Sequence, residues 1–296
     1  MRICILTQTA TDIPDYYKDF FRDKDLFFIT FKKHNAQAIA FMPNSTFADG
    51  RNRLWEEVKG EYDYYIFIDD DLQFFKPKIS FTPLATYLSH KLLYRGHIKD
   101  SYELATPNYF FSHLQGYLEK YQPEVLAGLG LGDTATRLDM AAMRKNSFVR
   151  RLGYFDGQIT VLSNYAASKL IPYDTKFSGW WSPQIPIFLY TFHVFGLKAL
   201  AISDIAVVNT VKNGVYVPNY DGLQDCKNML SAISDATGKD FNQYFRQNTA
   251  VVNFYGEKEI LKRLPQPEDK ENYAENFEHT LKGIETVLHK NMGFPD

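Results

Sequence analysis

The 296-residue sequence predicts an α/β fold in which helices cover both faces of a sheet. Short apolar runs of strand length alternate with amphipathic segments of helical length, a pattern typical of α/β domains. The run Tyr64–Ile68 is apolar throughout, which is typical of a strand buried on both faces. Hydrophobic residues make up 45% of the chain, enough for one large domain and a smaller appendage.

Composition argues against several classes of protein. The formal charge of −2 gives no bulk attraction to nucleic acid, so we expect no nucleic-acid partner. The two cysteines, Cys4 and Cys226, form no disulfide framework or zinc motif, and Cys4 lies in an apolar run typical of a buried thiol. The apolar run at the start of the sequence is too short for a signal peptide, and His193 and Lys198 interrupt the longest apolar region, 185–202. We therefore expect a soluble, cytoplasmic protein without a transmembrane segment.

The first part of the chain predicts three strands and two helices. Strands are expected at 2–8, 26–31 and 37–41, with a polar-aromatic helix at 12–22. A second helix is expected to begin at Asp49, because aspartate is a favoured N-cap residue.

That second helix carries a mixed face. Arg51, Leu54, Trp55 and Val58 fall at i, i+3, i+4 and i+7 and therefore share one side. Because the apolar members must pack on the sheet, Arg51 in the first turn lies toward the edge where the strands end. We expect it to meet the acidic run Asp69–Asp71 there as an arginine that holds a diphosphate. The alternatives are a structural ion pair or an arginine that extends to solvent.

Three consecutive aspartates, Asp69, Asp70 and Asp71, follow the buried strand directly. Open α/β sheets bind ligands at the carboxyl ends of their strands. Adjacent carboxylates repel one another unless a cation lies among them, and oxygen ligands suit Mg²⁺ or Mn²⁺. In an extended chain Asp69 and Asp71 would point the same way and Asp70 elsewhere. The alternative is a solvated acidic turn after a strand.

The middle of the chain predicts further alternation of helices and strands. A short strand, Glu124–Ala127, is expected to lead into a flexible glycine loop, 128–132, whose spacing matches no nucleotide-binding fingerprint. The other expected elements are helices at 83–93, 102–121, 164–170 and 185–195 and strands at 159–162 and 197–208.

The chain changes character near residue 211, and we expect a catalytic domain over 1–211 followed by a mostly helical C-terminal extension, 212–296. A linker is predicted at 264–270. The last helix places apolar side chains from Tyr273 to Leu288 on one stripe. Such a stripe must pack on the same chain, on a partner subunit or on a membrane surface, so an oligomer and peripheral membrane contact both stay open.

The apolar strand that runs into Asp69-Asp70-Asp71 resembles the Asp-x-Asp motif of GT-A-fold glycosyltransferases. The order of elements over residues 1–210 is also similar to that fold. The resemblance implies a Rossmann-type mixed sheet flanked by helices. It also implies a hexosyltransferase that uses a nucleotide-sugar donor, with a UDP-sugar favoured, and Mn²⁺ or Mg²⁺ as cofactor.

The same resemblance implies roles for residues around the motif. The metal ion would be held by Asp69, Asp71 and Asn209 and would bridge the donor diphosphate, where it stabilises the departing nucleoside diphosphate. Donor-binding residues are expected in the motif and on the helix before it. They are Arg51, Asn52, Asp69 and Asp70.

Two adjacent tryptophans, Trp180 and Trp181, lie in a loop rich in Gly, Ser and Pro. They resemble the aromatic segment that lines the acceptor site of GT-A enzymes, so we expect a glycan or glycoconjugate acceptor there. Inverting members carry a carboxylate near the start of the next helix as general base, whereas this chain has Ser182-Pro183-Gln184. Either the base comes from elsewhere, such as Asp156, Asp174 or Asp133, or the enzyme retains the anomeric configuration and needs no strong base here. Gln184 is similar to a glutamine of some retaining enzymes, so catalytic residues are expected among Asp71, Asp156 and Gln184.

Three other functions fit parts of the pattern. A phosphatase or phosphotransferase of the haloacid dehalogenase class also places Asp-x-Asp after a strand, although Gln73 stands where that class has Thr or Val. A nucleotidyltransferase would carry a glycine-rich loop near the first strand, which residues 7–12 lack. A sugar-nucleotide-binding domain without catalysis fits the missing carboxylate beside Trp181.

Overall fold

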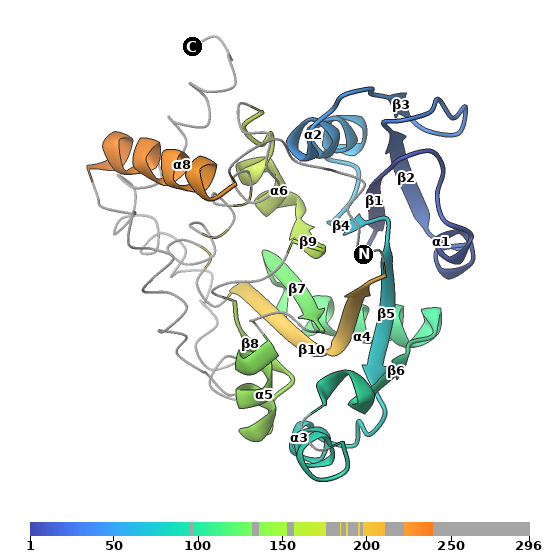
Figure 1. The fold of residues 1–296 in the computed structure, drawn as a ribbon, viewed down its shortest axis with the longest axis vertical. Helices are drawn as coiled ribbons and strands as arrows, with labels where there is room; N and C mark the ends of the chain where they lie inside the picture. The colour runs from blue at the N-terminus through green and yellow to red at the C-terminus, as the bar shows by residue number, and fades with distance from the viewer. Residues whose placement is uncertain are drawn as a thin grey trace.

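The structure is a computed structural model that describes residues 1–94, 97–131, 136–152, 157–175, 184, 188, 195, 198–210 and 222–238. In these residues ten strands form one mixed sheet with the order β3-β2-β1-β4-β9-β7-β10-β5-β6, and β8 pairs with β10. Helices flank the sheet (Figure 1). The predicted class, a mixed α/β sheet flanked by helices, is confirmed.

Most strands of the sheet run in one direction. β1 is parallel to β2 and β4, and β7 is parallel to β10, whereas β9 lies antiparallel between β4 and β7. The carboxyl ends of β1, β2, β4, β7 and β10 therefore meet at one edge, together with the start of β9. The strands are β1 (Ile3–Thr9), β2 (Asp25–Thr30), β3 (Ala40–Phe41), β4 (Tyr64–Asp69), β5 (Leu72–Pro77), β6 (Tyr102–Leu104), β7 (Val125–Gly130), β8 (Val149–Arg151), β9 (Ile159–Ser163) and β10 (Ala199–Asn209).

The helices begin at strong local signals. Thr82 and Thr106 each accept a hydrogen bond from a backbone N–H of the first turn, and each is followed by proline at the first helical position. The helices are α1 (Asp15–Phe20), α2 (Phe47–Val58), α3 (Pro83–Leu92), α4 (Pro107–Tyr121), α5 (Thr136–Arg144), α6 (Asn164–Leu170) and α8 (Gly222–Thr237), with the short 3₁₀ helix η1 (Ile98–Ser101) before β6.

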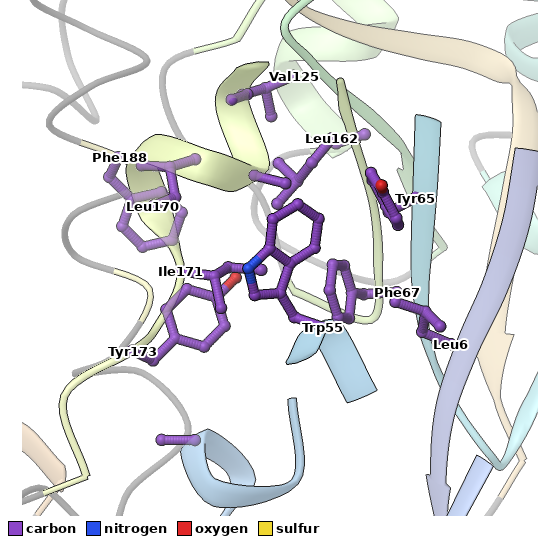
Figure 2. Close-up of a cluster of buried hydrophobic side chains, with 14 of the residues drawn as sticks. Leu6, Trp55, Tyr65, Phe67, Val125, Leu162, Leu170, Ile171, Tyr173 and Phe188 are labelled. Carbon is purple, nitrogen blue, oxygen red and sulfur yellow. The ribbon is translucent and has the colours of Figure 1, made fainter. Parts of the chain in front are cut away.

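One face of the sheet is covered by α2, α6 and α8. Trp55 of α2 packs among apolar side chains of β4, β9 and the segment after α6, as Figure 2 shows. Met229, Leu230 and Ile233 of α8 belong to the same buried cluster. This helix of the expected C-terminal extension therefore shares a core with the sheet.

The other face is covered by α1 and α4. Phe20 of α1 stacks on Phe74 of β5 with 4.6 Å between ring centroids, and Phe110 of α4 meets the same ring edge-on at 4.8 Å. Such aromatic pairs stabilise packing beyond the area that they bury. They fix α1 against the strand that follows the three aspartates.

Several predicted elements need correction. Thr46 rather than Asp49 is the N-cap of α2, because the Thr46 side chain accepts from the Asp49 N–H while the Asp49 carboxylate accepts from the Thr46 N–H, a reciprocal capping box. The expected glycine loop is partly strand, since β7 continues to Gly130. At Gly128 a side chain would come within 3.2 Å of the Ile205 carbonyl oxygen, so glycine allows β10 to approach.

The predicted helix at 185–195, the linker at 264–270 and the last amphipathic helix lie outside the described residues, apart from single positions at 188 and 195. The division at residue 211 stays a prediction. Among the residues that the structure describes, no helix combines the length and apolarity needed to cross a membrane.

Candidate active site

The three aspartates lie where the order of the sheet changes direction. From β1 the chain proceeds outward to β2 and β3 and then returns to form β4 on the other side of β1. In open α/β sheets ligands bind at such a switch point, outside the carboxyl ends of the strands. Asp69 ends β4 opposite Gln8 of β1, and Asp70 and Asp71 form the turn into β5. We call residues 69–71 the acidic turn.

Asp69 is paired with the predicted arginine. One Arg51 guanidinium nitrogen lies 3.3 Å from Asp69 Oδ1 and also 3.3 Å from the carbonyl oxygen of Gly157. The Arg51 side chain is only 5% exposed, and its guanidinium carbon lies 4.2 Å from the ring centroid of Phe47. This arginine therefore holds α2, the acidic turn and the start of β9 together, which fits the structural ion pair that the sequence left open.

Tyr17 of α1 spans the acidic turn. Its hydroxyl donates to the carbonyl oxygen of Asp69 and accepts from the N–H of Leu72, 3.1 Å away. The ring is fully buried. Burial raises the pKa of the Tyr17 hydroxyl, and the neighbouring carboxylates add to the shift, so it stays protonated and able to donate.

Asp70 faces the loop that follows β1. Burial raises the pKa of its carboxyl group, while hydrogen bonding by Thr9 and by the Ala10 N–H lowers it in part. We expected Asp69 and Asp71 to point the same way, which requires extended backbone through Asp71. The strand ends at Asp69 and residues 70 and 71 form a turn, so this expectation does not apply. Within the turn, the charge of Asp70 acts on Asp71 and raises its pKa.

Asp71 meets the end of β10. Burial and the charge of Asp70 raise the pKa of Asp71 to about 6, and a hydrogen bond from the Asn209 side chain lowers it in part. The carbonyl oxygen of Asp71 accepts from both the N–H and the hydroxyl of Thr210, each at 2.8 Å. The structure therefore brings Asp71 and Asn209 together, two of the three residues expected to hold a metal ion.

Asn52 bonds to the backbone of another segment. Its amide nitrogen donates to the Tyr173 carbonyl oxygen at 2.8 Å, and its amide oxygen accepts from the Tyr173 N–H at 2.6 Å. Through this pair α2 fixes the segment after α6. The structure thus gives Asn52 a positioning role, and its expected contact with the donor stays a prediction.

Gln184 lies against the same segment as Arg51. Its carboxamide occupies the space where a Cβ on Gly157 would stand, and its side chain is buried. Gly157 in turn offers its carbonyl oxygen to Arg51. Gln184 is thus linked to Asp69 through Gly157 and Arg51, while the predicted Asp156, Trp180 and Trp181 lie outside the described residues.

Of the two alternative bases, Asp133 and Asp174, the structure describes Asp174. Asp133 lies outside the described residues. Asp174 is 1% exposed, directly after the residue that Asn52 fixes. In the structure it is therefore a buried carboxylate.

The residues present fit a metal ion that takes part of its coordination from a ligand. In the described part of the chain, no three His, Cys, Asp or Glu side chains are grouped so as to hold a metal by themselves. Asp71 and Asn209 supply a carboxylate and an amide, and Asp70 adds negative charge beside them. Mg²⁺ is commonly held by one or two carboxylates together with substrate phosphates. Asp69 is engaged by Arg51, which makes it a weaker candidate ligand than the sequence implied.

Sequence reasoning missed the residues that support the acidic turn. They are Gln8, Thr9, Ala10, Tyr17 and Thr210. Gln8 and Thr9 had one usable signal, because polar residues end an otherwise apolar strand. For Tyr17 and Thr210 no local signal exists, since each meets the turn from a distant part of the chain.

Comparison with known proteins gives limited likeness. No protein-family model and no curated protein match the chain. A crystal structure of GalNAc-T7 with UDP, GalNAc and Mn²⁺ aligns with a TM-score of 0.46 and 10% identity, over 98% of this chain and 58% of that one. The synthetase for CMP:2-keto-3-deoxy-manno-octonic acid, complexed with CTP, aligns at 0.34 and 11% identity, over 70% of this chain and 90% of that one. The chain thus spans less than two thirds of the GalNAc-T7 structure. Because both TM-scores are below 0.5 and both identities are near 10%, the function is argued from the site itself.

Proposed function

We propose that this protein is a metal-dependent glycosyltransferase that moves a sugar from a nucleotide-sugar donor, preferably a UDP-sugar, to a glycan or glycoconjugate acceptor. The observation that carries the proposal is the acidic turn at the switch point of the sheet, where Asp71 and Asn209 meet beside the charge of Asp70. The resemblance of the strand and its three aspartates to the GT-A motif supports the choice of donor.

The chain's own groups would act on the diphosphate end of the donor. Asp71 and Asn209 would hold Mn²⁺ or Mg²⁺, which supplies charge stabilisation to the departing nucleoside diphosphate when bound. Asp70 keeps the local field negative. Tyr17 holds the backbone of the turn in place and Arg51 holds the Asp69 side chain, so that the carboxylates need little rearrangement when the donor binds.

The repulsion between Asp70 and Asp71 also explains why a cation is expected. In the absence of a positive charge, both carboxyl groups have pKa values raised by burial, and Asp71 is raised further by Asp70. Binding of a divalent ion removes this repulsion. The Arg51 cation lies on the side of Asp69, so a second positive charge has a place on the side of Asp71.

The test is a thermal-shift panel of UDP-, GDP-, CMP- and TDP-sugars with and without Mn²⁺, followed by detection of nucleoside diphosphate release. A ligand present at about 100 times its Kd stabilises the folded state by about 2.7 kcal/mol, which is a measurable rise in melting temperature. We expect a rise with one nucleotide class that requires Mn²⁺ and is lost in Asp71→Asn.

Asp63→Asn is the matched control, because Asp63 precedes β4 at the opposite end of the strand and its side chain is 58% exposed. This variant should bind like the wild type. A folded protein that binds none of these donors would contradict the proposal. Hydrolysis of sugar phosphates instead would favour the phosphatase alternative, and use of CTP with a free sugar acid would favour a nucleotidyltransferase.

A further inference from the structure

Helix α3 has its apolar side turned to solvent. Leu84, Leu88 and Leu92 repeat every four residues and are 39%, 44% and 73% exposed. Thr86 and His90, by contrast, are buried. A helix of a globular protein normally shows the opposite arrangement, with its apolar stripe toward the core.

The buried side of α3 is polar, with local hydrogen bonds at Thr86 and Ser89, while the buried His90 Nδ1 has no hydrogen-bond partner among the described residues. The Thr86 hydroxyl donates to the Ile79 carbonyl oxygen, and the Ser89 hydroxyl donates to the carbonyl oxygen of Thr86. The helix therefore turns its polar side toward the domain, where it lies next to α5 and η1. Its leucines need not pack on the domain for the helix to form.

The exposed apolar residues continue beyond the helix at both ends. Phe81 is 92% exposed just before α3, and Leu93 is 65% exposed just after it. We call Phe81, Leu84, Leu88, Leu92 and Leu93 the apolar row. Leu84, Leu88 and Leu92 share one side of the helix because they are four residues apart, and apolar surface gathered in this way marks an interaction site.

The segment that carries the apolar row is rich in basic residues. The sequence has no acidic residue between Asp71 and Asp100, a stretch that contains Lys76, Lys78, Lys91, Arg95 and Lys99. Lys76 pairs with Glu103 at 2.8 Å, so the uncompensated charge of the described part rests on Lys78, Lys91 and Lys99. This contrasts with the chain as a whole, whose net charge is −2. The basic character of the segment is therefore local.

A neighbouring element adds to that charge. Lys99 lies beside Asp100 in η1, which contacts α3, so the added positive charge comes from α5. The exposed Arg144 and Lys145 lie at the end of α5, next to Asn146, whose side chain accepts a hydrogen bond from the Leu84 N–H. Figure 1 shows α3 and α5 together at one end of the molecule.

We infer that the apolar row and its basic surroundings dock on an anionic lipid surface. An exposed apolar helix face flanked by lysine and arginine is the arrangement with which proteins bind the interface of a bilayer. The leucines and Phe81 would lie among the acyl chains near the headgroups, and the lysines would lie at the phosphates. This inference does not depend on the proposed catalytic activity.

Charge argues against a second copy of the chain as the occupant. A two-fold contact through α3 would place the same basic residues of both copies against one another. Like charges across a contact oppose association. A lipid surface with anionic headgroups supplies the opposite charge and an apolar layer at once.

The experiment is vesicle co-sedimentation of the full chain with phosphatidylcholine alone and with phosphatidylcholine containing phosphatidylglycerol. We expect binding only to the anionic vesicles, weakened by high salt because the charge interaction is screened. Replacing Leu88→Ser together with Leu92→Ser should weaken binding by about tenfold or more, as should Lys91→Glu. These side chains are exposed, so the variants should keep the melting temperature of the wild type.

Two matched controls change exposed side chains on α6 and after α2, outside the apolar row. Tyr165→Ser removes a large side chain that is 54% exposed on α6, and Lys59→Glu reverses an exposed charge after α2. Both should bind vesicles like the wild type. Equal binding to neutral and anionic vesicles, equal binding by the leucine variant, or a dimer in light scattering that Leu88→Ser abolishes would each overturn the inference.

Discussion

The Arg51 guanidinium approaches Asp69 Oδ1 at 3.3 Å while lying 4.2 Å from the centre of the Phe47 ring. Since the Arg51 side chain is buried and Asp69 is about a third exposed, the pair is partly shielded from water. Arg51→Met would leave the Asp69 carboxylate and the Gly157 carbonyl oxygen without this donor. We expect a loss of about 2 kcal/mol in the free energy of unfolding, measured by urea denaturation.

The same helix provides the control for that variant. Arg53 pairs with Glu57 at the surface, and both side chains are more than a third exposed. Arg53→Met should therefore change stability by less than about 0.5 kcal/mol. Equal effects of the two substitutions would show that the Arg51–Asp69 pair stabilises the fold no more than an exposed surface pair does.

Tyr17→Phe tests the support of the acidic turn. The change removes the hydroxyl that bonds to the Asp69 carbonyl oxygen and the Leu72 N–H, and leaves both groups buried without that partner. We expect a destabilisation of about 1–3 kcal/mol and weaker Mn²⁺-dependent donor binding. Denaturation and thermal shift measure the two effects.

Tyr16→Phe is its neighbour control. The Tyr16 hydroxyl makes only a 3.4 Å contact with the Phe74 N–H, and its side chain is not fully buried. A smaller loss of stability and unchanged donor binding are expected. If Tyr17→Phe bound donor as tightly as the wild type, the hydrogen bonds of the Tyr17 hydroxyl would contribute to folding alone.

Asp71→Asn should raise the stability of the metal-free protein at neutral pH. The pKa of Asp71 is raised to about 6, above the ordinary value of 3.8, so the folded state binds this proton more tightly than the unfolded chain does. The ionised carboxylate is therefore unfavourable above about pH 6, and the cost disappears below about pH 4. We expect the melting temperature to rise by about 2 °C at neutral pH and to stay unchanged near pH 4.

Bound metal should make the wild type more stable than Asp71→Asn. With Mn²⁺ and donor present, the wild type gains stability that Asp71→Asn lacks. Because a proton and the cation compete for Asp71, we expect Mn²⁺ affinity to fall by about tenfold for each pH unit below about 6. Calorimetric titration across this range measures it, and an affinity independent of pH would remove Asp71 from the set of ligands.

Gly157→Ala tests the contact with Gln184. The added methyl group would overlap the Gln184 carboxamide, which is buried. Overpacking of this kind costs about 1–3 kcal/mol. In Gln184→Ala the space is open, so adding Gly157→Ala to that variant should cost much less. Additive losses in the double variant would place the strain elsewhere.

The sequence carried enough information to predict the centre of the sheet and the buried face of α2. Tyr64–Ile68 are all buried, and so are Arg51, Leu54, Trp55 and Val58. The first prediction rests on an uninterrupted apolar run and the second on helical periodicity, and burial imposes both patterns on the sequence directly. Cys4 is also the buried thiol that its apolar surroundings predicted.

The contacts that build the site could not be predicted in the same way. β5 was missed because its edges are set by pairing with β10, whose partner residues lie far away along the chain. The resemblance implied donor binding for Asn52 and catalysis for Gln184, yet Asn52 bonds to the Tyr173 backbone and Gln184 packs against Gly157. Local sequence does not say whether a polar side chain meets backbone or ligand.

The bond between Thr210 and Asp71 joins residues 139 positions apart. During synthesis, β4 and the three aspartates leave the ribosome long before β10 exists to meet them. Contacts of such large sequence separation carry a loop-closure cost and slow folding. We therefore expect the nascent chain to expose its carboxylates until β10 pairs with β5, so that a fragment ending before residue 199 folds without a finished acidic turn.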